Sequence, residues 1–254
     1  MLSLYVQCAQ IIAVYMALFF IYAVYKKDNS VVDVAWGTGF IIIAWYSLFA
    51  QGMYQPYHFL ITLLVTVWGT RLSWHIYLRN HGKSEDPRYA AWRRQWVWVN
   101  VRSFFQVFVL QGAILLIIAY PIMFINSHVT PALGWYALAG MALWIFGFVF
   151  ESIGDYQLKQ FLSDARNRGR IMREGLWKYT RHPNYFGESC MWWGIFVIAC
   201  GVPGGWTTFV SPLLLTYLLL YVSGIPLAEQ QLQNNPEFQA YARSTNAFFP
   251  WWPR

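Results

Sequence analysis

Long apolar stretches alternate with short polar segments along this chain. An α-helix crosses the hydrocarbon core of a bilayer with about 20 apolar residues. Seven stretches approach that length, at residues 4–25, 34–50, 57–78, 104–125, 132–153, 186–201 and 206–224. The pattern predicts an all-α, polytopic membrane protein with about seven transmembrane helices.

Basic residues fall in every second loop of this pattern. Lys and Arg follow the first, third and fifth stretches and occur again in the tail, whereas Gln51–Pro56, Asn126–Pro131 and Gly201–Gly205 contain none. Of 18 basic residues, only Arg71 lies well inside a predicted span. Because short cytoplasmic loops collect Lys and Arg, we expect an odd number of helices, with the N-terminus outside and the C-terminus in the cytoplasm.

The composition is typical of a membrane protein and indicates which binding partners its positive charge requires. Hydrophobic residues make up 57% of the chain and charged residues 11%, against roughly 25% charged in an ordinary soluble domain. The net charge of +7 follows from basic loops beside anionic lipid, so it requires no nucleic acid, although it also suits an anionic cofactor.

The three cysteines have neither metal-site spacing nor a disulfide pattern. We expect the first apolar stretch to be a retained helix rather than a signal peptide.

Charged groups at membrane depth are the first candidates for chemistry. Each is unfavourable by about 2.5–3.5 kcal/mol on insertion scales, so such groups mark a partner, a cavity or a function. The candidates are Asp33, Arg71, Glu151, Asp155, Glu188 and Glu229. Pairs between helices, such as Asp33 with Arg71, or a position at headgroup depth are the structural alternative.

A polar stripe leaves the fifth stretch toward the second basic loop. Glu151, Asp155 and Lys159 are spaced four apart, so they share one helix face. The loop that follows contains several arginines, among them Arg168 and Arg170. Guanidinium groups match phosphate geometry, so this loop is a candidate phosphate site. Basic cytoplasmic topology alone is the other explanation of these arginines.

The run Tyr179-Thr-Arg-His-Pro-Asn-Tyr-Phe-Gly-Glu188 carries the most information. Its proline biases His182 away from helix and predicts a new helix that starts there. Arg181, His182 and Asn184 would then surround a helix N-terminus, which favours anions. Glu188 lies one turn further on the Asn184 face, where a carboxylate can accept hydrogen bonds from an amide or a ribose. A purely structural helix cap is the alternative.

Soluble-type nucleotide, zinc and serine-hydrolase motifs do not occur in the sequence. A dinucleotide would therefore have to bind among helices and loops.

At these residues the chain resembles the steroid 5α-reductase family, in particular its bacterial branch labelled as a domain of unknown function, DUF1295. The likeness covers most of the chain from about residue 30. Its segments are Asp33-Val-Ala-Trp-Gly-Thr-Gly-Phe, Arg71 to Asn80-His-Gly-Lys, Leu110-Gln-Gly, Asp155-Tyr156 and Gly175-Leu-Trp-Lys-Tyr to Glu188. Arg-His-Pro-Asn-Tyr-Phe-Gly-Glu is the most specific piece, and sterol reductases have a closely similar run.

The resemblance implies a seven-helix reductase that binds NADPH in a cytosol-facing cavity. It would deliver hydride to the β carbon of an enone and protonate the α carbon. By position, the residues that match the family's dinucleotide-binding residues are Asn80, Asp155, Tyr179, Asn184 and Glu188. Charge adds Lys159, Arg168, Arg170, Arg181 and His182 to this candidate set.

The resemblance also implies a carboxylate and a tyrosine that bind the substrate ketone. Asp33 falls near the family's glutamate. The family's tyrosine has no counterpart in Val67-Trp-Gly-Thr-Arg71, so Tyr77 and Tyr89 are the nearest candidates, and we select Tyr89. A donor at the developing oxyanion is required by the chemistry.

This interpretation predicts one transmembrane domain over residues 1–254 that functions as a monomer. Residues 1–125 would face a lipophilic substrate, a steroid or another enone, and residues 132–254 would hold the cofactor. The expected location is the bacterial inner membrane, or the endoplasmic reticulum in a eukaryote.

Two other functions stay open. An isoprenylcysteine-type methyltransferase, which uses S-adenosylmethionine, shares an Arg-His-Pro-x-Tyr run and an acidic tail helix. The paired glutamates of these methyltransferases are absent here, because the corresponding segment is Ala228-Glu-Gln-Gln. A transporter or lipid-binding scaffold is the second, although transport usually leaves polar groups near the midplane.

Overall fold

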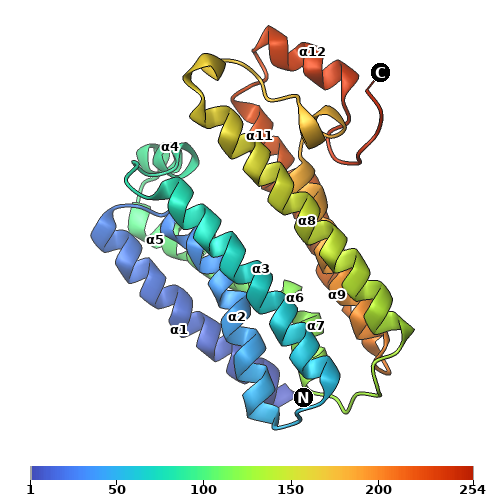
Figure 1. Cartoon of the computed structure of the whole chain (residues 1–254). Coiled ribbons are helices and arrows are strands. Elements are labelled where there is room, and N and C mark those ends of the chain that lie inside the picture. Colours follow the sequence, from blue (N-terminus) through green and yellow to red (C-terminus); the bar gives the residue numbers. More distant parts are fainter. Residues whose placement is uncertain (1, 254) are drawn as a thin grey trace. The chain divides into compact units, whose positions relative to one another are not determined.

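The computed structural model describes residues 2–253, and all regular secondary structure within them is helical. The chain forms two compact units (Figure 1). Unit 1 comprises Met1–Gly134 and Ala199–Thr208, and unit 2 comprises Trp135–Ile198 and Phe209–Arg254. The prediction of an all-α fold is confirmed.

Unit 1 is a bundle in which α2 is the central helix, packed against α1, α3 and α7. Gly37 on α2 and Gly69 on α3 bring the two helices together, since an added Cβ at either position would meet the other's carbonyl oxygen at 2.7 Å. Small residues allow this close approach of two backbones. The helices of unit 1 are α1 (Leu2–Lys26), α2 (Val31–Gln51), α3 (Pro56–Asn80), α4 (Pro87–Gln95), α5 (Val99–Ser103), the π-helix η1 (Phe104–Val109), α6 (Leu110–Ile118) and α7 (Tyr120–Asn126).

The predicted helix at 104–125 is interrupted in the structure. It begins as the π-helix η1 and continues as α6, and α7 starts after Ala119 with a proline in its first turn. Pro121 has no backbone N–H and its ring crowds the preceding turn, which explains the break. The apolar pattern does not report this change in the backbone, because both pieces are equally apolar.

Unit 2 is built on a close pair of long helices. Three glycines of α8 face α9 at intervals of seven residues, and the backbones meet there: Gly140 lies against Gly194, Gly147 against Gly187, and Gly154 against Pro183. The helices of unit 2 are α8 (Trp135–Ser163), η2 (Ala165–Asn167), η3 (Gly175–Lys178), α9 (Pro183–Cys200), α10 (Val210–Tyr217), η5 (Leu218–Val222), α11 (Ile225–Gln230) and α12 (Pro236–Ser244). The last two residues of α9, and η4 (Gly205–Phe209) up to Thr208, belong to unit 1.

Six helical segments in the described residues are long and apolar enough to cross a membrane. The chain is therefore an integral, multi-pass membrane protein. The sixth predicted span, 186–201, is helical as α9, which has 18 residues and is not among the six segments. The count of seven and the orientation of the termini stay predictions.

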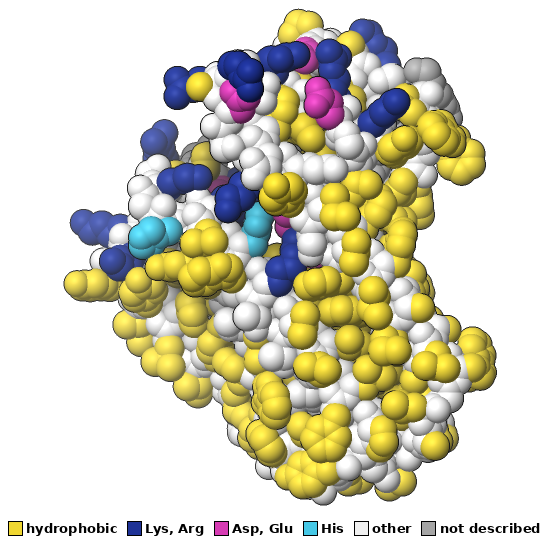
Figure 2. All heavy atoms as spheres, viewed as in Figure 1, with side chains coloured by type: hydrophobic (Ala, Val, Ile, Leu, Met, Phe, Trp, Pro, Cys, Tyr) yellow, Lys and Arg dark blue, Asp and Glu magenta, His cyan; other side chains and the backbone are white. Residues whose placement is uncertain are grey.

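Polar and apolar side chains are separated along the helices of each unit. In Figure 2, Lys and Arg side chains gather near α4 in unit 1 and near α12 in unit 2, and hydrophobic side chains cover most of the remaining visible surface. α8 continues ten residues beyond the predicted end of its span, to Ser163. Asp155 and Lys159 therefore lie on a helix, as their spacing predicted.

Candidate functional site

Two clusters of charged side chains contain several of the predicted site residues, one cluster in each unit. We call the first the Asp33 cluster, formed by Asp33, Asp86, Arg88, Tyr89 and Gln111 of unit 1. We call the second the Arg181 cluster, formed by Arg181, His182 and Glu229 of unit 2.

The structure brings the two predicted catalytic residues into direct contact. The Tyr89 hydroxyl donates a hydrogen bond of 2.7 Å to Oδ1 of Asp33. Arg88 donates from Nη2 to the other oxygen, Oδ2, at 3.1 Å. Gln111 on α6 donates from Nε2 to the Tyr89 oxygen at 3.3 Å. One oxygen of the Asp33 side chain thus accepts from the Tyr89 phenol, and the other accepts from the Arg88 guanidinium.

Helix α4 positions these donors because its start is fixed. Asp86 is the N-cap of α4 and accepts from the Arg88 amide at 3.0 Å, and Pro87 occupies the first turn. The Arg88 side chain bridges the cap to Asp33, with 2.9 Å from Nε to Oδ1 of Asp86. Glu85 adds a second tie, since it binds Arg93 at 3.0 Å and accepts from the Asn29 amide at 2.7 Å.

The electrostatics of α4 keep Tyr89 protonated. Burial, followed by the charge of Asp33 and the hydrogen bond to it, raises the pKa of Tyr89 well above its usual value. Burial alone would raise the pKa of Asp86, but the hydrogen bonds and charge of Arg88 outweigh it and the pKa is lowered. Arg88 keeps its charge, because the two carboxylates outweigh burial and raise its pKa. At neutral pH the Tyr89 phenol therefore remains a hydrogen-bond donor beside Arg88, which keeps its charge.

Sequence reasoning did not single out Arg88. It lies in a loop whose basic residues are already explained by membrane topology, so its charge carried no extra signal. The available signal was local: Asp86-Pro87 is a typical N-cap and N1 pair. This pair places residue 88 in the first turn, beside Tyr89.

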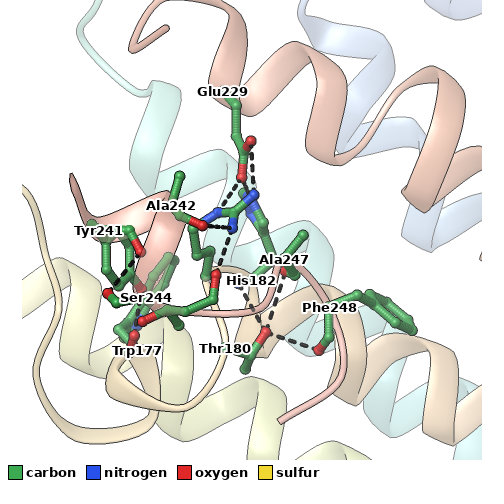
Figure 3. Close-up of polar contacts among 11 residues, drawn as sticks. Trp177, Thr180, His182, Glu229, Tyr241, Ala242, Ser244, Ala247 and Phe248 are labelled. Atoms are coloured by element: carbon green, nitrogen blue, oxygen red, sulfur yellow. Dashed lines mark hydrogen bonds and ion pairs between the residues drawn. The ribbon is translucent and has the colours of Figure 1, made fainter. Parts of the chain in front are cut away.

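The Arg181 cluster ties the start of α9 to α11 and to the C-terminal part of the chain (Figure 3). The guanidinium of Arg181 donates to Glu229 at 2.8 Å and 3.2 Å, and to the carbonyls of Thr245 and Ala242 at 2.6 Å and 3.2 Å. His182 contacts the same carboxylate from Nε2 at 2.9 Å. Side-chain exposures are only 12% for Arg181 and 16% for Glu229.

Neighbouring residues extend this tie to α8. Thr180 donates from Oγ1 to the Phe248 carbonyl at 2.8 Å, and Tyr241 donates its hydroxyl to the Trp177 carbonyl. The Trp177 indole in turn donates to the Gly154 carbonyl of α8 at 3.0 Å. In this structure Arg181 and His182 therefore bind protein groups, and their predicted role as dinucleotide ligands stays a prediction.

The other predicted cofactor residues of unit 2 differ in their solvent exposure and in their hydrogen-bond partners. Asn184 has its Oδ1 atom buried without a hydrogen-bond partner, so it is an acceptor suited to an amide or a hydroxyl. Lys159, Arg168 and Arg170 are exposed, Asp155 is buried, and Glu188 is half-buried on the Asn184 face of α9. Tyr179 is half-buried, and its ring lies 5.3 Å from that of Trp252.

Asn80 is the predicted cofactor residue of unit 1. It ends α3, and its Nδ2 atom is buried without a partner while its Oδ1 atom accepts from Arg79 at 3.2 Å. Buried polar groups are normally hydrogen-bonded, so the unpaired Nδ2 atom of Asn80 in unit 1 and the unpaired Oδ1 atom of Asn184 in unit 2 are each exceptions. Within residues 2–253, no group of three His, Cys, Asp or Glu side chains could hold a metal ion.

Comparisons with known proteins identify a family and partial relatives. A family model described as "Protein of unknown function (DUF1295)" matches residues 19–245. The chain is 33% identical over 67 residues to 3-oxo-5-alpha-steroid 4-dehydrogenase 1 of Mus musculus and of Rattus norvegicus, and 31% identical over 67 residues to that of Bos taurus. The match spans 26% of this chain and 26% of each relative. No solved structure matches the chain.

Proposed function

The chain belongs to the DUF1295 family, and on that premise we propose that it is an NADPH-dependent membrane reductase. Its substrate would be a lipophilic enone whose C=C bond is reduced, with a 3-oxo-Δ4 steroid as the model. The partial similarity to the mammalian dehydrogenases supports a related membrane reductase. The proposal adds the cofactor, the substrate class and the residue roles.

The contact between Asp33 and Tyr89 is the observation that carries the proposal. Reduction of an enone builds negative charge on the carbonyl oxygen, so the site needs a donor aimed at that oxygen. Tyr89 is a neutral phenol at neutral pH, and its proton is held by a single acceptor at 2.7 Å. A ketone oxygen that approaches Tyr89 competes with Asp33 for that proton, and Arg88 keeps the released carboxylate paired.

NADPH would supply the hydride that adds to the β carbon of the enone. Tyr89 donates its hydrogen bond to the carbonyl oxygen as that oxygen becomes an enolate, and a proton from water then adds to the α carbon. Asn184 would accept from a carboxamide or ribose group of the cofactor, Glu188 would extend the same face, and Arg168 and Arg170 would meet the phosphates. Asn80, Asp155, Lys159 and Tyr179 complete the proposed set.

Turnover of a labelled cofactor tests the proposal directly. Purified protein in nanodiscs is given NADPH that bears deuterium at C4 of the nicotinamide, with a panel of steroid and polyprenoid enones. We expect consumption of NADPH and deuterium at the β carbon of the product. Tight binding of S-adenosylmethionine with no affinity for NADPH would instead establish the methyltransferase alternative.

Binding measurements test the cofactor residues separately. Loss of one hydrogen bond in Asn184→Ala should weaken NADPH binding by about tenfold, and Glu188→Ala should also weaken it. Asn234→Ala is the matched control, because Asn234 is exposed in the loop before α12. Undiminished binding in both Asn184→Ala and Glu188→Ala would show that the cofactor site lies elsewhere.

A further inference from the structure

The last residues of the chain are held in place although they form no helix. We call residues 246–252 the tail. The Arg181 amide donates to the Asn246 carbonyl at 2.9 Å, and the Trp251 amide donates to the Tyr179 carbonyl at 2.9 Å. Between these two bonds, Thr180 donates to the carbonyl of Phe248 at 2.8 Å. Residues 179–181 therefore fix the backbone of the tail at three points.

The fixed backbone presents large aromatic side chains outward. Phe248 is buried, whereas Phe249, Trp251 and Trp252 are 66%, 67% and 70% exposed. Pro250 and Pro253 restrict the backbone on both sides of the tryptophans. Exposure of these rings to water is unfavourable, because the free energy of hydrating apolar surface rises with its area. The three rings therefore point to an environment other than water.

The chemistry of the tail matches the interface of a bilayer rather than its core. All six candidate spans end before residue 231, so the tail is not part of a span. Trp is the residue typical of headgroup depth, because its ring is apolar and its N–H needs a polar partner. Cations flank the rings: Lys178 precedes the Tyr179 carbonyl that binds Trp251, and Arg243 lies on α12 shortly before the tail, and both are exposed.

We propose that Phe249, Trp251 and Trp252 form a docking surface for the headgroup region of a lipid leaflet that contains anionic lipid. Lys178 and Arg243 meet the phosphates, and the rings enter the boundary between headgroups and acyl chains. The inference does not depend on the proposed reduction. Because the tail is bonded to residues 179–181, docking also fixes the run from Tyr179 to Asn184 at a set depth.

Spin-label accessibility measures that depth. A nitroxide is placed by Trp252→Cys in a background in which Cys8, Cys190 and Cys200 are replaced by Ala. Matched labels sit at Arg168→Cys, on the exposed loop, and at Leu18→Cys, on an exposed position of α1. In nanodiscs with phosphatidylglycerol, we expect access of a water-soluble nickel chelate at 252 to be several-fold lower than at 168, and access of oxygen to be lower than at 18. Equal nickel access at 252 and 168 would overturn the proposal.

The contribution of charge is tested by lipid composition and by Lys178→Glu. Nickel access at 252 should rise when phosphatidylglycerol is replaced by phosphatidylcholine, and Lys178→Glu should produce a similar rise. The surface would instead meet a second copy if two observations were made together. Two Trp252→Cys chains would form a disulfide with each other, and nickel access at residue 252 would be low only in nanodiscs that hold two copies.

The unmodified chain provides a check that requires no cysteine replacement. A phospholipid with a photoactivatable diazirine in its headgroup is incorporated into the nanodisc and activated, and labelled peptides are identified by mass spectrometry. The peptide that contains residues 249–252 should be labelled. If loop peptides near the membrane are labelled and this peptide is not, the proposal is wrong.

Discussion

The Asp33 cluster and the Arg181 cluster use similar groups in different ways. In the Arg181 cluster one carboxylate accepts from Arg181 and His182, and backbone carbonyls take the remaining guanidinium hydrogens. In the Asp33 cluster the Tyr89 proton is shared with one acceptor, and Arg88 already balances that acceptor. We propose that the Arg181 cluster is a structural tie and the Asp33 cluster a reactive arrangement, although only the Arg181 cluster lies in the sequence motif from Tyr179 to Glu188.

Removal of the Glu229 carboxylate should have the largest effect on stability. Glu229→Ala leaves Arg181 and His182 buried without their acceptor, which typically lowers the free energy of unfolding by about 3–5 kcal/mol. The midpoint of thermal unfolding in detergent measures it. Glu174→Ala, at an exposed position, should stay within about 0.5 kcal/mol of the wild type. A wild-type midpoint for Glu229→Ala would contradict the structural role of the Arg181 cluster.

Tyr89→Phe should affect the rate rather than the fold. Loss of one donor to a developing oxyanion typically lowers kcat by about 10²–10³, while the lost hydrogen bond changes stability by about 1 kcal/mol. Steady-state kinetics and the unfolding midpoint separate the two effects. Tyr77→Phe, at an exposed tyrosine of α3, is the matched control and should keep its activity. Full activity of Tyr89→Phe would remove Tyr89 from the mechanism.

Arg88→Lys should give a smaller loss that reports on positioning. Lys presents one point charge and cannot bind Asp33 and Asp86 together as the planar guanidinium does. We expect kcat/KM to fall by about tenfold, a loss of about 1.4 kcal/mol in transition-state stabilisation. Arg94→Lys tests the same change at an exposed position of α4. Equal activity of both variants would show that Arg88 does not position Asp33.

Acid should loosen α4, and this is the smallest effect that we expect. The folded-state pKa of Asp86 is lower than its usual value, so its stabilisation is fully present above the unfolded value of about 3.9. It is lost as the pH falls through the lower, folded pKa. Hydrogen exchange of the α4 amides, corrected for intrinsic rates, should therefore stay constant from neutral pH down to about 4 and rise below it. Asp86→Asn should abolish this transition, and a transition that survives the substitution would assign it to another group.

Much of the architecture follows from the apolar pattern. Every predicted span is helical over most of its length, because seven apolar stretches near bilayer length have few alternatives in a lipid environment. The start of α9 at Pro183 was predicted from the fixed φ of proline. The irregular backbone at η1 and η5 was not. A π-helical segment depends on local packing that a hydropathy pattern does not encode.

The clusters show where sequence reasoning reaches its limit. It placed Asp33 and Glu229 among the candidates as charged groups at membrane depth, and Tyr89 through the resemblance to the steroid 5α-reductase family. It could not pair them, since Asp33 and Tyr89 are 56 residues apart and His182 and Glu229 are 47 apart. Contacts over such separations depend on how helices pack. Arg88 on the Asp33 carboxylate shows this, because the sequence did not single out Arg88 as a partner of Asp33.

The glycine contacts between α8 and α9 have a mechanical consequence for unit 2. Where two backbones touch at three successive levels, neither helix can slide or rotate without steric overlap, so the pair moves as one stiff body. Asp155 on one helix and Asn184 on the other then keep a constant separation. We therefore expect rearrangement within unit 2 in its connecting segments, for example residues 169–173, which form no helix.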